Sequence, residues 1–167
     1  PHLSMQVGIV SDTHNHWDDR IESFFAPCDV ILHAGDIGSL ALADRIAAFR
    51  PLIAVSGNID DSATRREYPL TFDGLIGSCH ILMLHIGGHP GHYAPNVRKA
   101  IRDAKPDIFV CGHSHILRVA FDRSLNTLYI NPGAYGLQGF HTVRTAVRLQ
   151  LDGATPHDLE VLELPRR

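Results

Sequence analysis

Short apolar runs rich in β-branched residues recur along the chain, and each of them ends in a small group of polar residues. In the first half, segments with apolar residues at helical spacing separate these runs. Strands that alternate with helices are expected to pair in parallel, because each crossover helix returns the chain to the same end of the sheet. The expected strands here are residues 6–11, 29–33, 52–55 and 107–111, and the expected helices are 18–26, 40–49 and 95–104.

The pattern changes after His115, where strand-like runs follow one another with only turns between them. A turn at Asp73-Gly74 is also expected, between strands at residues 69–72 and 79–84. The later strands are expected at residues 116–121, 127–130, 142–151 and 159–164, with turns at 125–126, 132–133 and 152–153. The sequence therefore predicts an α/β fold with two mixed sheets packed together and helices outside.

The length of 167 residues fits one domain, which we place at residues 5–167. Residues 1–4 precede a natural start at Met5, and we interpret them as a cloning remnant. The three cysteines are odd in number and have no paired short spacing. We therefore expect them to be buried apolar residues, not a disulfide framework or a thiolate zinc site.

The charge balance constrains the partners. With 15 basic and 18 acidic residues, the formal net charge is −3, which argues against long nucleic acid or an anionic membrane as the partner. No apolar run approaches the ~18–20 residues that a transmembrane helix needs. No signal peptide is visible either, so the expected location is the cytoplasm. A small anionic substrate remains compatible with this charge, provided that bound cations supply positive charge locally.

Polar residues that can bind metal follow five of the expected strands. Carboxyl ends of parallel strands meet at one edge of a sheet, so these side chains are expected to converge. Clustered carboxylates and imidazoles repel one another or stay unpaired without a cation between them. Oxygen and nitrogen ligands without thiolates suit Mn, Fe, Zn, Co or Ni. The predicted ligands are Asp12, His14, Asp36, Asn58, His85, His113 and His115.

Four of these ligands form two pairs, one Asp-x-His and one His-x-His. Alternate residues of an extended segment point to the same side, so Asp12 with His14, and His113 with His115, are each expected to hold one metal from one side. A glycine precedes Asp36, Asn58 and His113. Because glycine has no side chain, we expect the backbone to crowd around the site at these positions.

The ordered set of motifs resembles the calcineurin-like metallophosphoesterases. It comprises Asp12-Thr13-His14, Gly35-Asp36, Gly57-Asn58, His85 and Gly112-His113-Ser114-His115. The runs His33-Ala34-Gly35-Asp36, His85-Ile86-Gly87-Gly88 and Asn131-Pro132-Gly133 are similar to the small bacterial and archaeal phosphodiesterase branch of the YfcE/MJ0936 type. The resemblance extends over residues 5–144 and implies a four-layer α/β/β/α sandwich.

The resemblance also implies roles for the ligands and two divalent metal ions, with Mn the first choice and Fe, Ni, Zn or Co as alternatives. The first metal would be held by Asp12, His14, Asp36 and His115. The second would be held by Asp36, Asn58, His85 and His113, so that Asp36 bridges. A hydroxide between the metals would attack a small phosphoester, and a diester is the expected substrate. The resemblance also implies that Asp36 and Asn58 are catalytic residues as well as metal ligands.

One position departs from the family pattern. Many members have histidine directly after the asparagine ligand, where it stabilises the transition state or protonates the leaving group, and this chain has Ile59. His89 is our candidate replacement for that proton donor, with His92 as its neighbour. The alternative function is a non-catalytic scaffold of the same fold that binds protein partners, and a metal hydrolase acting on another bond is a second alternative. Assembly into a homo-oligomer is left open.

Overall fold

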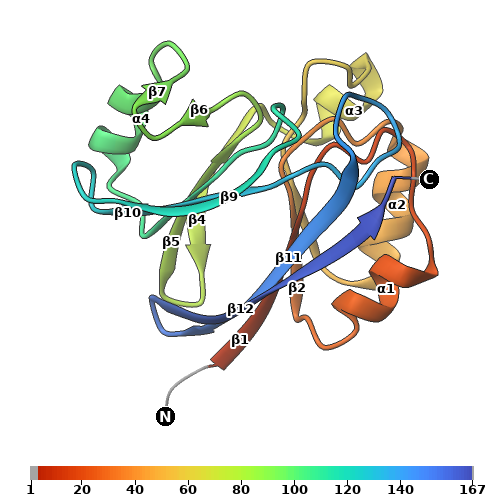
Figure 1. Cartoon of the computed structure of the whole chain (residues 1–167), viewed down its shortest axis with the longest axis horizontal. Helices are drawn as coiled ribbons and strands as arrows, with labels where there is room; N and C mark the ends of the chain where they lie inside the picture. The colour runs from red at the N-terminus through yellow and green to blue at the C-terminus, as the bar shows by residue number, and fades with distance from the viewer. Residues whose placement is uncertain (1–3, 167) are drawn as a thin grey trace.

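Two five-stranded sheets form the centre of the computed structural model, which describes residues 4–166 (Figure 1). The first sheet has the order β12-β11-β1-β2-β3, and the second has the order β4-β5-β8-β10-β9. The first consists of β1 (Ser4–Val10), β2 (Val30–His33), β3 (Leu52–Ala54), β11 (Val143–Asp152) and β12 (Thr155–Pro165). The second consists of β4 (Thr71–Ile76), β5 (Cys79–Leu84), β8 (Ile108–Val110), β9 (Leu117–Asp122) and β10 (Thr127–Pro132).

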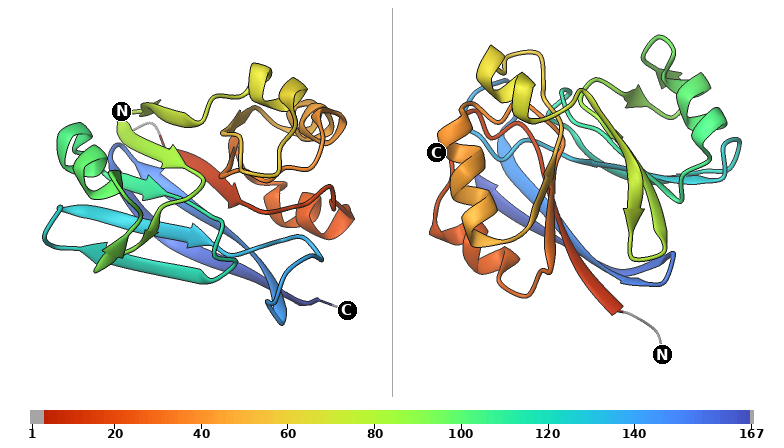
Figure 2. Two further views of the ribbon diagram at one scale, coloured as in Figure 1. Left: turned by 90° about the horizontal axis from the view of Figure 1, so that it is seen from above. Right: turned by 180° about the vertical axis from the view of Figure 1, so that it is seen from behind.

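Helices cover the outer faces of both sheets. α1 (Asp19–Phe25) and α2 (Leu40–Phe49) lie on the first sheet, and α4 (Val97–Ala104) lies on the second (Figures 1 and 2). The buried apolar residues fall into three clusters, one between the sheets and one beneath the helices on each side. The predicted four-layer α/β/β/α sandwich is therefore confirmed.

The parallel strands of each sheet lead into the loops of the candidate site. β1, β2 and β3 are parallel to one another, and so are β5, β8 and β10. The remaining strands β4, β9, β11 and β12 are antiparallel additions at the sides. The loops that follow the parallel strands are the ones that carry the predicted ligands.

Two short elements were not expected from the sequence. α3 (Ser62–Glu67) has no apolar stripe, and its start depends on Asp61, whose side chain accepts the N–H of Thr64. β6 (Gly88–His89) and β7 (His92–Tyr93) form a hairpin of two residues on each side. Elements this short have too few residues to show a period of 2 or 3.6.

The turn predicted at Asp73-Gly74 is wrong. β4 runs straight through both residues, pairing Asp73 with Leu82 and Gly74 with Ile81, and the chain reverses later, at residues 77–78. A Cβ atom at Gly74 would lie 2.8 Å from the ring of Phe72, so the glycine makes room for an aromatic ring within the strand. Here glycine serves packing and not a turn.

The structure tests little of the domain boundary predicted at Met5. Residues 1–3 of the predicted remnant lie outside the described residues, while Ser4 is the first residue of β1 and pairs with Asp152. The division at Met5 stays a prediction. Within residues 4–166, no helix has the length and apolar composition needed to cross a bilayer.

Candidate metal centre

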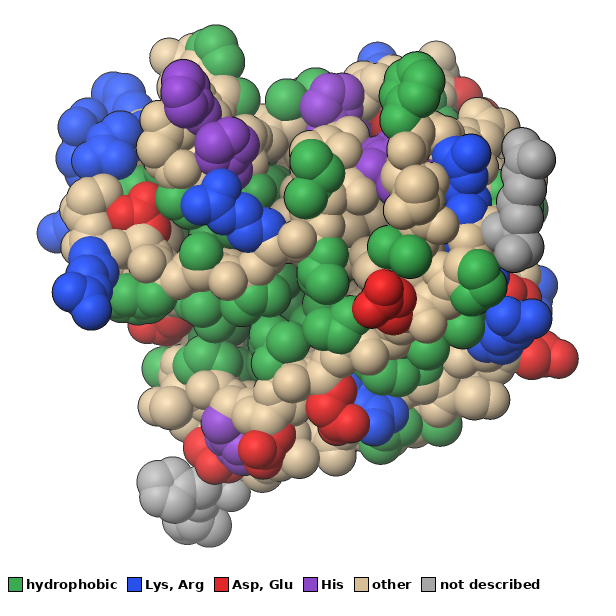
Figure 3. Space-filling model, in the orientation of Figure 1, with side chains coloured by type: hydrophobic (Ala, Val, Ile, Leu, Met, Phe, Trp, Pro, Cys, Tyr) green, Lys and Arg blue, Asp and Glu red, His purple; other side chains and the backbone are tan. Residues whose placement is uncertain are grey.

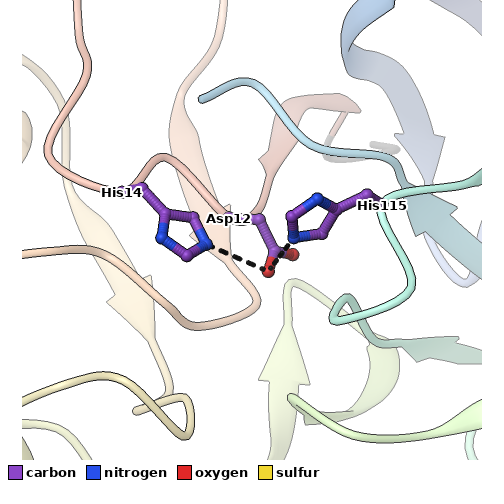
Figure 4. A group of neighbouring side chains, drawn as sticks. All are labelled: Asp12, His14 and His115. Carbon is purple, nitrogen blue, oxygen red and sulfur yellow. Dashed lines mark ion pairs between the residues drawn. The ribbon is translucent and has the colours of Figure 1, made fainter. Parts of the chain in front are cut away.

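The structure brings the predicted ligands together in two adjoining groups. Ligand atoms lie within 4.8 Å of one another in each group. The first group is Asp12, His14 and His115 (Figure 4), and the second is Asp36, His85 and His113. Each group takes side chains from both sheets, because residues 12, 14 and 36 follow β1 and β2, whereas residues 85, 113 and 115 follow β5 and β8. Figure 3 shows histidine side chains along the upper edge of one face.

Each of the two carboxylates has one oxygen held by the protein. Asp12 Oδ2 accepts the hydroxyl of Ser11 at 2.6 Å and the N–H of His113 at 3.0 Å. Asp36 Oδ1 accepts the N–H of Ile59 at 3.0 Å. The other oxygen of each carboxylate is left to face the imidazoles.

Nitrogen atoms of three histidines surround these remaining oxygens. Asp12 Oδ1 lies 3.2 Å from His115 Nε2, 3.8 Å from His85 Nε2 and 3.9 Å from His14 Nε2. Asp36 Oδ2 lies 3.2 Å from His85 Nε2 and 3.7 Å from His14 Nε2. The Nε2 atoms of His14 and His85 thus each lie within 4 Å of both carboxylates.

Several of these atoms are buried without a hydrogen-bond partner. Within residues 4–166, Asp12 Oδ1, His14 Nε2 and His85 Nε2 have none. Burying an unpaired polar atom costs free energy comparable to a lost hydrogen bond. Because acceptor oxygens and imidazole nitrogens face one space, divalent cations fit the donor set, and they would satisfy all three atoms at once.

The carboxylates remain ionised at neutral pH. Burial acts to raise the pKa of Asp12, but the neighbouring imidazoles of His115 and His85 and the Ser11 hydroxyl outweigh it, so the pKa lies below its usual value. The pKa of Asp36 is also lowered: burial opposes the shift, and the neighbouring His85 imidazole and the hydrogen bond from the Ile59 N–H exceed it. Ionised carboxylates are the form that binds a cation.

His85 is held in the tautomer that leaves Nε2 free for a metal. Its Nδ1 lies 2.7 Å from the carbonyl oxygen of Ala34, which can only accept, so Nδ1 carries the proton. The lone pair on Nε2 then points at Asp36. A backbone carbonyl that fixes the second nitrogen is a common feature of metal-binding histidines.

The expectation that His113 and His115 hold one metal together is wrong. His113 belongs to the group with Asp36, whereas His115 belongs to the group with Asp12. The backbone is not extended here: φ is +70° at His113 and +64° at His115. Asp12, His14 and Asp36 also have positive φ, between +44° and +56°. Left-handed conformations of residues other than glycine are uncommon and concentrate at functional sites.

The glycines that precede ligands allow the loops to touch. A Cβ atom at Gly57 would lie 2.1 Å from Asp36 Oδ1, and one at Gly112 would lie 2.7 Å from Asp12 Oδ2. Both distances are too short for a real carbon atom. Absence of a side chain at these two positions is therefore what lets the ligand carboxylates approach the neighbouring loop.

Asn58 lies beside the second group, as its motif suggests. Its Oδ1 is 3.1 Å from His113 Nδ1, and its backbone carbonyl accepts a hydrogen bond from Arg65 at 3.1 Å. The Arg65 side chain is exposed, and it lines a cavity of about 350 Å³ together with Asn58 and His85.

His89 lies outside both groups. It is exposed on the β6–β7 hairpin, where its ring contacts the backbone carbonyl of Pro90 at 3.0 Å. It lines a separate cavity of about 230 Å³ that also borders Ser114 and Ile116. Its role as proton donor stays a prediction.

Two buried residues that support the ligand loops were missed. Asp60 accepts hydrogen bonds from the N–H groups of Gly57, Ile37 and Gly38, which lie in two different loops. The His33 ring accepts the N–H of Gly35 at Nδ1 and forms a hydrogen bond with the Thr13 hydroxyl through Nε2. Both stand inside motifs that the sequence displays, but a hydrogen bond to a distant backbone leaves no local pattern to read.

Comparison with known proteins agrees with the geometry. The model of the calcineurin-like phosphoesterase superfamily domain matches residues 5–154. The chain belongs to this superfamily. A probable metallophosphoesterase of Methanocaldococcus jannaschii is 27% identical over 139 residues, which cover 78% of this chain and 68% of the relative. The phosphodiesterase MJ0936 of the same organism is 29% identical over 141 residues, which cover 77% of this chain and 83% of the relative.

Solved structures share the fold at lower identity. A novel archaeal phosphodiesterase has a TM-score of 0.73 and 20% identity, with 96% of this chain and 100% of that chain covered. Vacuolar Protein Sorting 29 from Cryptosporidium parvum has a TM-score of 0.74 and 18% identity, with 97% and 98% covered. At these identities the likeness concerns the fold alone.

Proposed function

We propose that this phosphoesterase is a phosphodiesterase that acts on a small substrate with two divalent cations, manganese being the first choice. Asp12, His14, Asp36 and His115 would hold one cation, with Asp36 shared. Asn58, His85 and His113 would complete the second site. The observation that carries this proposal is the set of buried, unpartnered ligand atoms facing one space from two groups.

When bound, the cations would supply the positive charge that activates water and offsets the charge of the phosphoryl group. The protein's part is to hold the ligands in place beforehand. Ser11 and the His113 N–H fix Asp12, the Ile59 N–H fixes Asp36, and the Ala34 carbonyl fixes His85. Ile59 has no proton to give, so substrates with stable leaving groups are expected to react fastest.

Two cavities support a diester in preference to a monoester. One of about 430 Å³ borders His113 and His115 and is lined by Ile116 and Phe140. The other, of about 350 Å³, borders Asn58 and His85, and it is lined by Arg65, Leu70 and Ile86. A phosphodiester carries two organic arms. One cavity beside His113 and His115 and another beside Asn58 and His85 give each arm a place.

The test compares bis-p-nitrophenyl phosphate with p-nitrophenyl phosphate, using chelated protein reconstituted separately with Mn, Ni, Zn and Mg. We expect metal-dependent release of nitrophenolate that is faster from the diester. Asp36→Asn and His85→Ala should each lower turnover by about 100-fold or more while the circular dichroism spectrum stays unchanged. The matched control is His157→Ala, a histidine on β12 that lies in neither ligand group. Unchanged turnover in Asp36→Asn would refute the proposal.

The scaffold function makes the opposite prediction. Vacuolar Protein Sorting 29 shares this fold, so a protein of this shape with another role is a specific alternative. That alternative is favoured if the wild-type protein binds no cation and hydrolyses neither ester. The cytoplasmic location expected from the sequence stays a prediction, and assembly into a homo-oligomer stays open.

A further inference from the structure

His141 lies in the loop between β10 and β11 and contacts one of the proposed ligands. Its Nδ1 is 3.2 Å from His115 Nδ1, and its Nε2 is 2.8 Å from the carbonyl oxygen of Gly136. The two rings meet edge to face, with centroids 5.0 Å apart and an interplanar angle of 81°.

The direction of each hydrogen bond follows from the carbonyl. A carbonyl oxygen can only accept, so His141 Nε2 carries a proton. In the neutral ring, Nδ1 is then an acceptor, and within residues 4–166 the nitrogen that faces it at hydrogen-bonding distance is Nδ1 of His115. His115 Nδ1 must therefore carry its own proton, which leaves Nε2 of that ring without one. This Nε2 is the atom that lies 3.2 Å from Asp12.

We propose that His141 is a positioning residue that holds His115 in the tautomer able to bind the first cation. This rests on the metal centre proposed above. The Ala34 carbonyl orients the His85 ring directly. The Gly136 carbonyl orients the His115 ring in the same way, but through the ring of His141. Partners of this kind orient the ligand ring and raise its basicity.

The loop that carries His141 is itself fastened to the site. The N–H of Gly136 donates to the carbonyl of Asp12 at 2.9 Å, so the carbonyl that orients His141 belongs to a residue bonded to the first ligand loop. Gly139 has a φ of +128°, and a Cβ atom there would lie 2.3 Å from His115 Nδ1. The glycine leaves room for the two rings to meet.

The same contacts argue against His141 as the missing proton donor. Its Nε2–H donates to the carbonyl of Gly136, and its Nδ1 accepts the N–H of His115. Neither nitrogen therefore has a free proton to donate to a leaving group. A positioning role is thus the one that both hydrogen bonds support.

The first experiment measures cation affinity by competition with a chromogenic chelator at pH 8. His141→Leu removes the acceptor, whereas His141→Asn places an amide oxygen near the former Nδ1 position in a side chain of similar size. We expect Leu to weaken binding of the first cation by tenfold or more, and Asn to restore it to within about threefold of wild type. His92→Leu, an exposed histidine on the β6–β7 hairpin, serves as the control.

The second experiment observes the tautomers directly. Long-range proton–nitrogen correlation spectra of zinc-saturated protein should show His141 protonated at Nε2 and His115 protonated at Nδ1. The opposite tautomer of His141 would overturn the proposal, and so would equal affinity of the Leu variant and wild type. If wild-type protein binds no cation at all, the metal centre itself fails, and the role of His141 fails with it.

Discussion

Asp60 illustrates how a residue outside the ligand set determines the shape of the site. Its carboxylate is buried and has the N–H of Gly57 at 2.8 Å, that of Gly38 at 3.0 Å and that of Ile37 at 3.2 Å. These N–H groups follow β2 and β3, so one side chain joins the Asp36 loop to the Asn58 loop. Three backbone donors replace the counter-ion that a buried carboxylate usually needs.

Removing this carboxylate should destabilise the fold. Asp60→Ala leaves three buried N–H groups without their partner, and we expect a loss of free energy of unfolding on the order of 3 kcal/mol. Asp44→Ala, at an exposed position in α2, should change it by no more than about 0.5 kcal/mol. Urea denaturation of both variants provides the measurement, and similar values for the two would contradict the assigned role.

His33 gives the stability a pH dependence. Its Nδ1 accepts the N–H of Gly35, so Nε2 donates to Thr13, whose hydroxyl donates in turn to the carbonyl of Ile37. Burial lowers the pKa of His33 to about 4, although the nearby charges of Asp60 and other carboxylates oppose the shift. The unfolded chain has the ordinary pKa of about 6.5. The neutral ring is therefore the form that the fold prefers.

Above pH 6.5 both states are neutral at His33, so this residue adds no pH dependence there. As the pH falls from 6.5 to 4, the unfolded chain takes up a proton that the folded chain does not. Stability should fall by up to about 3 kcal/mol over this window. We expect His33→Asn to be less stable than wild type at pH 8, and the difference should shrink toward pH 4.5. A constant difference in metal-free protein would show that another group is responsible.

The seven candidate ligands could be selected from the sequence because their residue types repeat after successive apolar runs, and the structure places six of them in two groups. The residues that hold them could not. Asp60 is an aspartate two positions after Asn58, and nothing nearby in the chain shows that it reaches Gly38. The assignment of His113 and His115 to different groups also escaped local reasoning, because positive φ at both residues breaks the alternation of a strand.

At the scale of elements, the loop between β10 and β11 carries two functions. His141 points inward to His115, while Phe140 is fully exposed and lines the larger cavity beside the ligands. An aromatic ring left in water beside a proposed site is suited to an apolar arm of the substrate.

Phe140→Ala should raise KM for bis-p-nitrophenyl phosphate by about three- to tenfold, because the second aryl arm loses a partner. Methyl p-nitrophenyl phosphate has the same leaving group with a small arm, so its KM should change little. Leu75→Ala, an exposed apolar residue on β4, is the matched control. Equal effects of Phe140→Ala on both esters would show that the ring does not contact the second arm.

Most elements were predictable because each has a clear period, and α2 agrees with its expected range at both ends. The failures have definite causes. The strand β4 continues through Asp73-Gly74 because Phe72 covers the glycine, and a turn signal in the sequence cannot reveal that. The strand order within the sheets depends on pairing between distant segments, such as β1 with β11, which no local pattern encodes.

At the scale of the whole molecule, the two ligand groups join the two sheets. Each group combines a carboxylate from the first sheet with at least one imidazole from the second, so a bound cation would link the layers at one end. Cations that bind only the folded protein stabilise it by mass action.

Adding manganese at 100 times its dissociation constant should raise the free energy of unfolding by about 2.7 kcal/mol for each site, and a chelator should reverse the effect. Thermal melts of chelated and reloaded protein would measure this. Asp36→Asn should show a much smaller shift. A shift of equal size in that variant would mean that the cation acts elsewhere.

The pairing of β1 has a consequence for how the protein is made. β1 lies between β2, which follows it closely, and β11 (Val143–Asp152), which is synthesised long after it. Until then one side of β1 has unpaired backbone groups, and an open strand edge invites pairing with other chains. The first sheet is therefore complete only once β11 has been made, so a product that stalls before Val143 is expected to be a substrate for chaperones and proteases.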